Sequence, residues 1–284
     1  MKKQILRTAS IIIIGLFLIS GKDNNYMFDA KYLEKSVTKI SDNLYAGKFE
    51  VSNAMYNQFL NELKRLSLNE DLKICQIDSM GWIADKQHYI EPFVALYHKH
   101  PEYYNYPVVN ISYEAANLFC KFITDSYNTD NTRKFKKVIF RLPTEEEWMI
   151  AAKAGHPNNK YANGNFIGAD DGEVFYNFDA SIYFKNLVNK KKSTAIYFPS
   201  DFLMPCQSYK ANDFGLYNMS GNAAEMISVK GITKGGSMID YEEALKIESK
   251  GTYEKSACNI GFRYFMEVVK PELGNDYDLN KIQK

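Results

Sequence analysis

The chain has 284 residues, a formal net charge of +1, 45% hydrophobic and 24% charged residues. This composition is typical of a globular protein with enough residues for one large domain or two small ones. The charge shows neither a basic surplus nor an acidic tail, which argues against a nucleic-acid-binding protein. Aromatic residues make up 14% of the chain, so we expect a loop-rich fold that holds many half-buried rings.

The N-terminus is typical of an export signal. Three basic residues precede a short apolar stretch, residues 11–19, which is too short for a good membrane span. We therefore predict a signal peptide over residues 1–21 and a tether over residues 22–38, with an uncleaved membrane anchor as the alternative. The segment is also similar to a bacterial lipoprotein signal. Lys22, however, stands where the lipid-carrying cysteine would be, and an amine cannot form the thioether.

The first half of the chain predicts a hairpin and two capped helices. Residues 44–51 alternate as a strand of that hairpin, and Ser52 then caps a helix with apolar residues at helical spacing. Residues 68–105 are expected to be irregular, because Gly and Pro interrupt any long element. Residues 107–111 form an apolar run that predicts a short buried strand, and Ser112 caps the second helix.

The second half predicts one more helix and long loops. A polar loop is expected over residues 125–137. Thr144 and Glu147 then have the spacing of a capping box at the start of a helix, which Gly155 ends. Residues 156–234 are rich in turn residues and poor in regular pattern. The fold class predicted for the chain is therefore α+β, with few regular elements and long ordered loops.

Four cysteines lie far apart in the sequence and form no CxxC pair: Cys75, Cys120, Cys206 and Cys258. This spacing excludes zinc-ribbon and thioredoxin-type motifs. An exported chain can hold disulfides, and three pairings of four cysteines are open. We expect buried free thiols with at most one bridge.

Five sequence blocks follow one another in a specific order: Pro107–Ser112, Arg141–Trp148, Asn212–Glu225, Lys234–Ser237 and Asn259–Arg263. In this order they resemble the formylglycine-generating enzyme (sulfatase-modifying factor) family over residues 40–268. The resemblance implies a C-type-lectin-like fold elaborated with long loops. The domain would span residues 39–268 and leave a C-terminal tail over residues 269–284.

The resemblance also implies a calcium site. In the family an Asn side chain, two backbone carbonyls and a Glu carboxylate bind the ion, and the matching residues here are Asn218, Gly221, Ala223 and Glu225. Calcium prefers about six to eight oxygen ligands, which a tight turn with one acid can help to provide. The alternative is an Asn-Gly turn beside an exposed acid. A second calcium site would lie at Asn177 and Phe178, with Asp201 nearby.

Active members of the family bind copper through two cysteines that closely follow the Gly-Gly-Ser turn, because soft thiolates suit Cu(I). In this chain residues 238–245 contain no cysteine, and Asp240 and Glu242 are hard ligands. Cys258 stands alone, where the family has no ligand. We therefore expect no copper centre in the cleft that Ser237 would mark.

Other branches of the superfamily use an iron centre of histidines in an extra helical domain, which this sequence lacks. His98, His100 and Glu102 alternate, and on a strand they would share a face as ligands of iron or zinc. Pro101 interrupts such a strand, so an exposed loop is the interpretation we favour. The sequence has no GxSxG elbow, P-loop, Rossmann glycine pattern or HExxH motif.

Two functions remain. The first is an exported, calcium-stabilised and non-catalytic binding or structural module with a protein partner in a bacterial periplasm, outer membrane or cell surface. Envelope lipoproteins of gliding-motility and secretion machineries in this family are similar. The second is a copper-dependent oxidase that converts a sulfatase cysteine to formylglycine. We favour the first, because the cysteine pair of the oxidase is missing.

Overall fold

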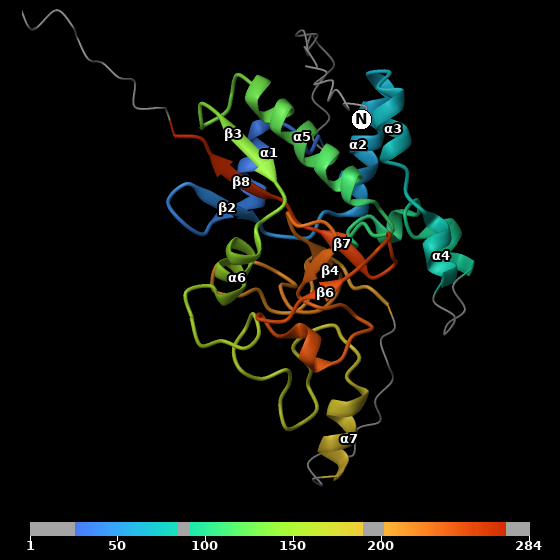
Figure 1. Ribbon diagram of the computed structural model, residues 1–284, viewed down its shortest axis with the longest axis vertical. Helices are drawn as coiled ribbons and strands as arrows, with labels where there is room; N and C mark the ends of the chain where they lie inside the picture. Colours follow the sequence, from blue (N-terminus) through green and yellow to red (C-terminus); the bar gives the residue numbers. More distant parts are fainter. Residues whose placement is uncertain (1–25, 85–90, 190–201, 271–284) are drawn as a thin grey trace, which may run out of the picture.

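Two four-stranded sheets and the helices around them build the part of the chain that the computed structural model describes, residues 26–84, 91–189 and 202–270 (Figure 1). The predicted signal peptide, the start of the tether and most of the C-terminal tail lie outside the described residues. Within the described ranges no helix is both long enough and apolar enough to cross a membrane.

The first sheet brings the two ends of the domain together. Its strand order is β1 (Val37–Lys39), β2 (Leu44–Gly47), β8 (Phe265–Val268) and β3 (Val138–Arg141), and all neighbours are antiparallel. The pairing of β1 with β2 confirms the predicted hairpin. Helix α5 (Tyr113–Thr129) packs against β3 (Figure 1). Because β8 lies between β2 and β3, the C-terminal strand joins elements that are far apart in the sequence.

The second sheet has the order β6 (Gly251–Thr252), β5 (Ile232–Lys234), β4 (Ala224–Met226) and β7 (Ile260–Phe262). The pair β4–β7 is parallel and the other pairs are antiparallel. Strand β7 is separated from β8 of the first sheet by two residues, of which the first is Arg263. The short link between the sheets therefore passes through this arginine.

The helix starts follow the predicted caps. The three helices are α2 (Asn53–Arg65), α5 (Tyr113–Thr129) and α6 (Glu145–Lys153), and they begin after Ser52, Ser112 and Thr144. Each cap side chain accepts a hydrogen bond from the backbone N–H three residues later. Thr144 and Glu147 form both hydrogen bonds of the capping box, which confirms that prediction.

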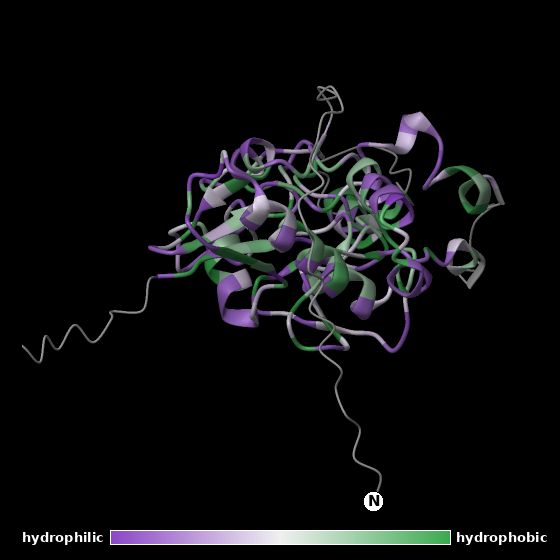
Figure 2. Cartoon of the chain, turned by 90° about the horizontal axis from the view of Figure 1, so that it is seen from above, coloured by the Kyte–Doolittle hydropathy of each residue, from purple (hydrophilic) through white to green (hydrophobic). Residues whose placement is uncertain are grey.

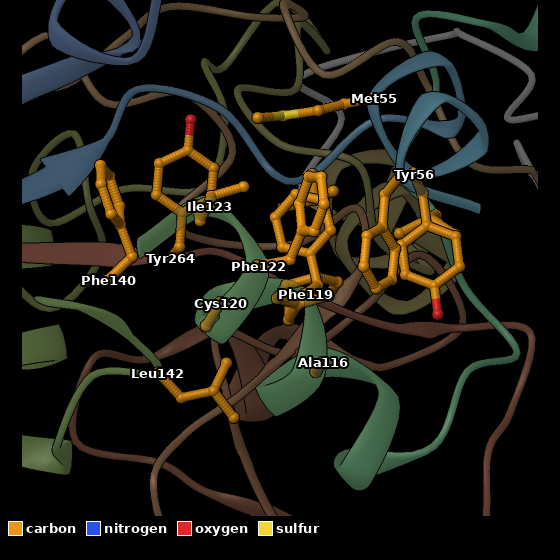
Figure 3. Packing of buried hydrophobic residues seen from close by; sticks show 14 of the residues in the cluster. Met55, Tyr56, Ala116, Phe119, Cys120, Phe122, Ile123, Phe140, Leu142 and Tyr264 are labelled. Atoms are coloured by element: carbon orange, nitrogen blue, oxygen red, sulfur yellow. The ribbon is translucent and has the colours of Figure 1, made fainter. Parts of the chain in front are cut away.

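The main core lies between α2, α5 and the first sheet (Figure 3). Phe59 from α2 and Phe119 from α5 meet edge to face, with ring centroids 5.3 Å apart. Tyr264 and Phe140 approach from the sheet side, and Cys120 is a small buried member of the same cluster, as expected. A second cluster surrounds Trp148 of α6. Figure 2 shows hydrophobic strands inside the molecule and hydrophilic residues on many outer loops.

Two predicted boundaries are wrong because tertiary contacts override the local pattern. The strand predicted over residues 44–51 ends at Gly47, since Glu50 turns inward and the Val51 N–H donates to the carbonyl of Phe262. The run 107–111 is buried but forms no strand beyond a single bridge from Pro107 to Ser52. Asn110 has a left-handed φ of 59°, which breaks the extended conformation.

Other segments are more regular than expected. Residues 68–105 contain short helical elements: α3 (Asn69–Ile74), α4 (Glu91–Leu96) and the 3₁₀ turns Ser79–Ala84 and Pro101–Tyr103. Helix α5 continues to Thr129, into the predicted polar loop, because Tyr127 is buried against the core. The expected tether includes helix α1 (Ala30–Ser36), whose Leu33 is a core residue. In the turn-rich region, α7 (Ser181–Asn189) was not predicted. A last 3₁₀ turn spans Glu242–Leu245.

Candidate functional site

Residues 218–225 form a buried turn that leads into β4. Asn218, Gly221 and Asn222 have positive φ angles of 53°, 81° and 67°, a region that Gly and Asn tolerate better than other residues. A Cβ atom at Gly221 would collide with the backbone carbonyl of Asn177. The close approach of these two backbones explains why the turn needs glycine.

Glu225 at the end of this turn is fully buried and paired with Arg263. The guanidinium Nη2 lies 2.6 Å from Oε1, and Nε donates to both carboxylate oxygens at 3.0 and 3.2 Å. The indole N–H of Trp148 donates to Oε2 at 2.8 Å. A buried ion pair needs this degree of hydrogen bonding to offset the cost of removing both charges from water.

Arg263 also holds the surrounding backbone. Its Nη1 donates to the carbonyl of Gly47 at 2.8 Å and its Nη2 to that of Tyr217 at 2.6 Å. Burial alone would lower the pKa of Arg263, but the attraction and hydrogen bonds of Glu225 raise it. The guanidinium therefore stays charged and joins the segment of Arg263 to the segments of Gly47, Tyr217 and Glu225.

A second buried carboxylate, Glu50, fills the inside of the turn. Its oxygens accept hydrogen bonds from the Nδ2 atoms of Asn218 and Asn222 and from the backbone N–H of Ala223, at 2.9 to 3.1 Å. Burial and the nearby charge of Glu225 raise the pKa of Glu50 to about 8, although Arg263 and the two amides oppose the shift. Glu50 was not among the predicted site residues.

Two of the four calcium ligands implied by the resemblance, Asn218 and Glu225, have side chains that are engaged with other protein groups. Both oxygens of Glu225 accept from Arg263 and Trp148, and Asn218 directs its N–H donors at Glu50. The turn thus offers donors to a carboxylate, whereas calcium requires oxygen acceptors. Calcium binding at Asn218, Gly221, Ala223 and Glu225 is implied by the resemblance alone, whereas the contacts of Glu225 predict that the ion does not bind.

The second expected calcium site contains one orphaned acceptor. Asn177 is buried, its Nδ2 donates to Phe202 and to Asn222 Oδ1, and its Oδ1 has no hydrogen-bond partner. Phe178 beside it is also buried, and Asp201 lies outside the described residues. A single amide oxygen fits one ligand position of a cation. Across the described ranges no three His, Cys, Asp or Glu side chains cluster as metal ligands would.

Ser237 does not line an open cleft. Its side chain is fully buried, and its hydroxyl donates to Asp240 Oδ2 at 2.6 Å and accepts from Asn259 Nδ2 at 3.0 Å. The Asp240 carboxylate also accepts from the Ser237 backbone N–H at 2.9 Å. The loop that resembles the copper-binding segment is therefore closed by its own hydrogen bonds.

All four cysteines are buried, and the described structure contains no disulfide. Burial raises the pKa of Cys75 to about 12 and also raises the pKa values of Cys120 and Cys206 well above the usual range of a thiol. These three thiols are protonated at neutral pH, whereas a thiolate is the form that binds metal. Cys258 packs in a cluster with Met238, the residue that follows Ser237.

The alternating histidines do not share a strand face. His98 is buried, and its Nε2 lies 3.1 Å from the carbonyl oxygen of Val109, while burial lowers its pKa to about 4. His100 is exposed and its Nδ1 accepts from the backbone N–H of Glu102, at the start of a 3₁₀ turn. The iron or zinc hypothesis for these residues fails because the segment turns instead of extending.

Comparison with known proteins agrees with the fold. The sequence profile described as "Sulfatase-modifying factor enzyme 1-like domain" matches residues 3–268. The chain belongs to the sulfatase-modifying factor family. It is 24% identical to the formylglycine-generating enzyme of mouse (Mus musculus) over 299 aligned residues, which cover 88% of this chain and 72% of the mouse protein. The enzyme of cattle (Bos taurus) is 23% identical with the same coverage.

A solved structure supports the sulfatase-modifying factor fold independently. Treponema denticola variable protein 1 is similar with a TM-score of 0.50 and 15% identity, over 82% of this chain and 91% of that protein. At this identity the likeness shows the fold alone. The predicted α+β fold of the formylglycine-generating enzyme type is confirmed.

Sequence reasoning missed the two residues that organise this member of the sulfatase-modifying factor family. Glu50 was interpreted as one position of a strand, and Arg263 as the last residue of the fifth sequence block. A signal for both exists, since an acid and a base in otherwise apolar runs must find partners if they are buried. The sequence could not show that Arg263 is the partner of Glu225, 38 residues away.

We predict that Arg263→Ala destabilises the protein by about 3–5 kcal/mol, because Glu225 would keep a buried charge without its partner. Urea denaturation followed by tryptophan fluorescence measures the change. Arg65→Ala is the matched control: Arg65 pairs with Glu62 but its side chain is 57% exposed, so we expect a loss below about 1 kcal/mol. Equal losses in the two variants would contradict the central role of Arg263.

We predict that the free energy of unfolding depends on pH through the titration of Glu50. Because the pKa of Glu50 is raised to about 8, the folded protein retains the carboxyl proton up to about pH 8, whereas the unfolded chain releases it near pH 4.5. The contribution of Glu50 is therefore complete below pH 4.5 and is lost as the pH rises towards 8, by up to about 1.4 kcal/mol per pH unit.

Glu50→Gln should remove this part of the slope in urea denaturation series, while Glu102→Gln, a change at an exposed acid, should leave it intact. A Glu50→Gln profile that keeps the slope of the unmodified protein would show that another group is responsible.

The pairing of Glu225 predicts that calcium does not stabilise this turn. Thermal melts in excess Ca²⁺ and in excess EGTA should agree, because no free carboxylate is offered to the ion. A bound ion at about 100 times its Kd would add about 2.7 kcal/mol and raise the melting temperature by several degrees. Such a rise, abolished in Asn218→Ala, would instead establish the calcium site.

Proposed function

We propose that this member of the sulfatase-modifying factor family is an exported, non-catalytic binding or structural module that engages a protein partner in a bacterial cell envelope. The observation that carries the proposal is the loop after Gly236. Where active members have two cysteines, residues 238–245 contain none, and Asp240 is bound to Ser237 instead.

The hydrogen bonds of this loop support a structural role. The buried Ser237 hydroxyl is hydrogen-bonded to the partly buried Asp240 and Asn259, and the Asp240 carbonyl accepts from the backbone N–H of Asp179. Carboxylate oxygens are poor ligands for Cu(I), so these residues cannot replace the thiolates. The loop stabilises the domain and leaves the long surface loops for recognition.

Export is supported by the basic and apolar pattern of residues 1–21, which is typical of a signal peptide. Lys22 stands in the position of a lipidated cysteine, so we propose attachment through a protein partner in preference to a lipid. Calcium is not part of the proposal, because Glu225 is already neutralised by Arg263.

The second candidate is a formylglycine-generating oxidase. It is favoured by the identity with the mouse enzyme and by the position of Cys258, which packs beside Met238 of the loop. Two-thiolate coordination would require a second cysteine to reach Cys258. The remaining cysteines lie elsewhere, with Cys75 and Cys120 in the main core and Cys206 beside Glu50.

Titration of the purified, reduced protein with Cu(I) separates the two candidates. We expect no stoichiometric thiolate charge-transfer absorption and no oxygen consumption with a cysteine-containing sulfatase peptide, because a two-thiolate site is lacking. Cys258→Ser and Cys120→Ser serve as matched variants. Stoichiometric binding that is lost in Cys258→Ser but kept in Cys120→Ser, together with oxygen consumption, would overturn the proposal in favour of the oxidase.

A further inference from the structure

A cavity of about 320 Å³ is lined by Glu50 and residues around it. Its walls come from the N-terminal segment, from residues 49–55 and from residues 205–207. None of its lining residues belongs to the segment 235–245. The volume is at the small end of the range for ligand pockets, about 300–1,000 Å³, and suits a single small group.

The exposure of the lining residues gives the cavity an entrance and a floor. Tyr32 and Gln207 are exposed and mark the entrance, whereas Glu50, Cys206 and Tyr264 are buried and form the floor. A group that enters from solvent therefore passes aromatic and amide side chains before it reaches the carboxylate.

The walls are held by contacts within the protein. The hydroxyls of Ser36 and Tyr264 are 2.8 Å apart, and the Cys206 backbone N–H donates to the carbonyl of Asn105 at 2.8 Å. Phe49 stacks on Tyr217 with ring centroids 5.2 Å apart. The pocket is thus largely formed before a ligand binds, which lowers the entropic cost of binding.

The charge of the floor selects the ligand. Among the described residues that line the cavity, Glu50 alone is an acid or a base of the Asp, Glu, Lys, Arg and His types. Its hydrogen-bond donors are neutral amides, and the nearby guanidinium of Arg263 is committed to Glu225. When Glu50 is ionised, the buried charges of Glu50, Glu225 and Arg263 add up to a net charge of −1.

We propose that this cavity binds a primary ammonium group, such as a lysine side chain, with Glu50 as the counter-charge and the rings of Tyr32, Phe49 and Tyr264 as its walls. An ammonium group near aromatic faces gains cation–π attraction in addition to the attraction of the carboxylate. Its N–H donors require acceptors, and the oxygens of Ser52, Asn105 and Gln207 belong to residues that line the same cavity. A carboxylate ligand would be repelled, and a neutral alkyl chain would lose both attractions.

The inference goes beyond the proposed function and does not depend on it. The cavity is separate from the loop that decides between module and oxidase, so either outcome of the copper titration leaves the pocket in place. The ammonium group can belong to a free amine or to a lysine of a partner protein, and two probes distinguish these sources.

The test is calorimetric titration of the full-length protein at about pH 9, where Glu50 is ionised and an alkylammonium group is still protonated. The probes are Nα-acetyl-lysine methylamide and, as the matched probe, its neutral norleucine analogue. We expect the lysine probe to bind at one site and the norleucine probe to bind at least about tenfold more weakly, since it lacks the charge. n-Butylamine is the third probe. Tighter binding of the lysine probe than of butylamine supports a protein lysine, and the reverse supports a free amine.

Two variants locate the binding. Glu50→Gln, checked for its fold by circular dichroism, should weaken the lysine probe by at least about tenfold. Tyr32→Ala changes only the entrance and should weaken it by about two- to thirtyfold. Tyr241→Ala, at an exposed tyrosine far from the lining residues in sequence, should have no effect. Equal binding of lysine and norleucine probes, unchanged binding in Tyr32→Ala, or no binding of either amine at about 10 mM would overturn the proposal.

Discussion

The buried ion pair between Glu225 and Arg263 is the interaction on which the rest of this structure depends. Glu225 lies in β4 of the second sheet, and Arg263 lies in the short link from that sheet to β8 of the first. The guanidinium also donates to the carbonyls of Gly47 and Tyr217, and the indole N–H of Trp148 in α6 donates to the Glu225 carboxylate. Both sheets and α6 are therefore held at one desolvated point, where loss of either charge leaves the other without compensation.

The same pair decides what the neighbouring turn can do. With Glu225 neutralised, the turn at residues 218–223 directs its N–H donors at Glu50, and so it has the polarity of an anion site. The copper-type loop shows a comparable change, because Asp240 binds Ser237 within the loop. The fold of the sulfatase-modifying factor family is kept in both places, while Glu225 is hydrogen-bonded to Arg263 and the loop 238–245 has no cysteine.

Glu50 links this interior to the molecular surface. It accepts hydrogen bonds from the turn on one side and forms the floor of the cavity on the other. A buried acid with neutral donors is a costly feature unless a proton or a cation compensates it. The proposed ammonium site supplies that compensation, and it gives the domain a recognition function that is independent of oxidation chemistry.

Features that depend on neighbouring residues could be predicted from the amino-acid sequence. The caps at Ser52, Ser112 and Thr144 and the first hairpin were predictable, because their hydrogen bonds join residues a few positions apart. The order of five motifs also identified the fold. Three other features depend on contacts between distant residues: residues 107–111 are not a strand, Ser237 is buried, and Glu225 forms an ion pair with Arg263. These features depend on which distant residues the fold brings together away from water. A buried charge there needs a partner, and the tertiary structure supplies it.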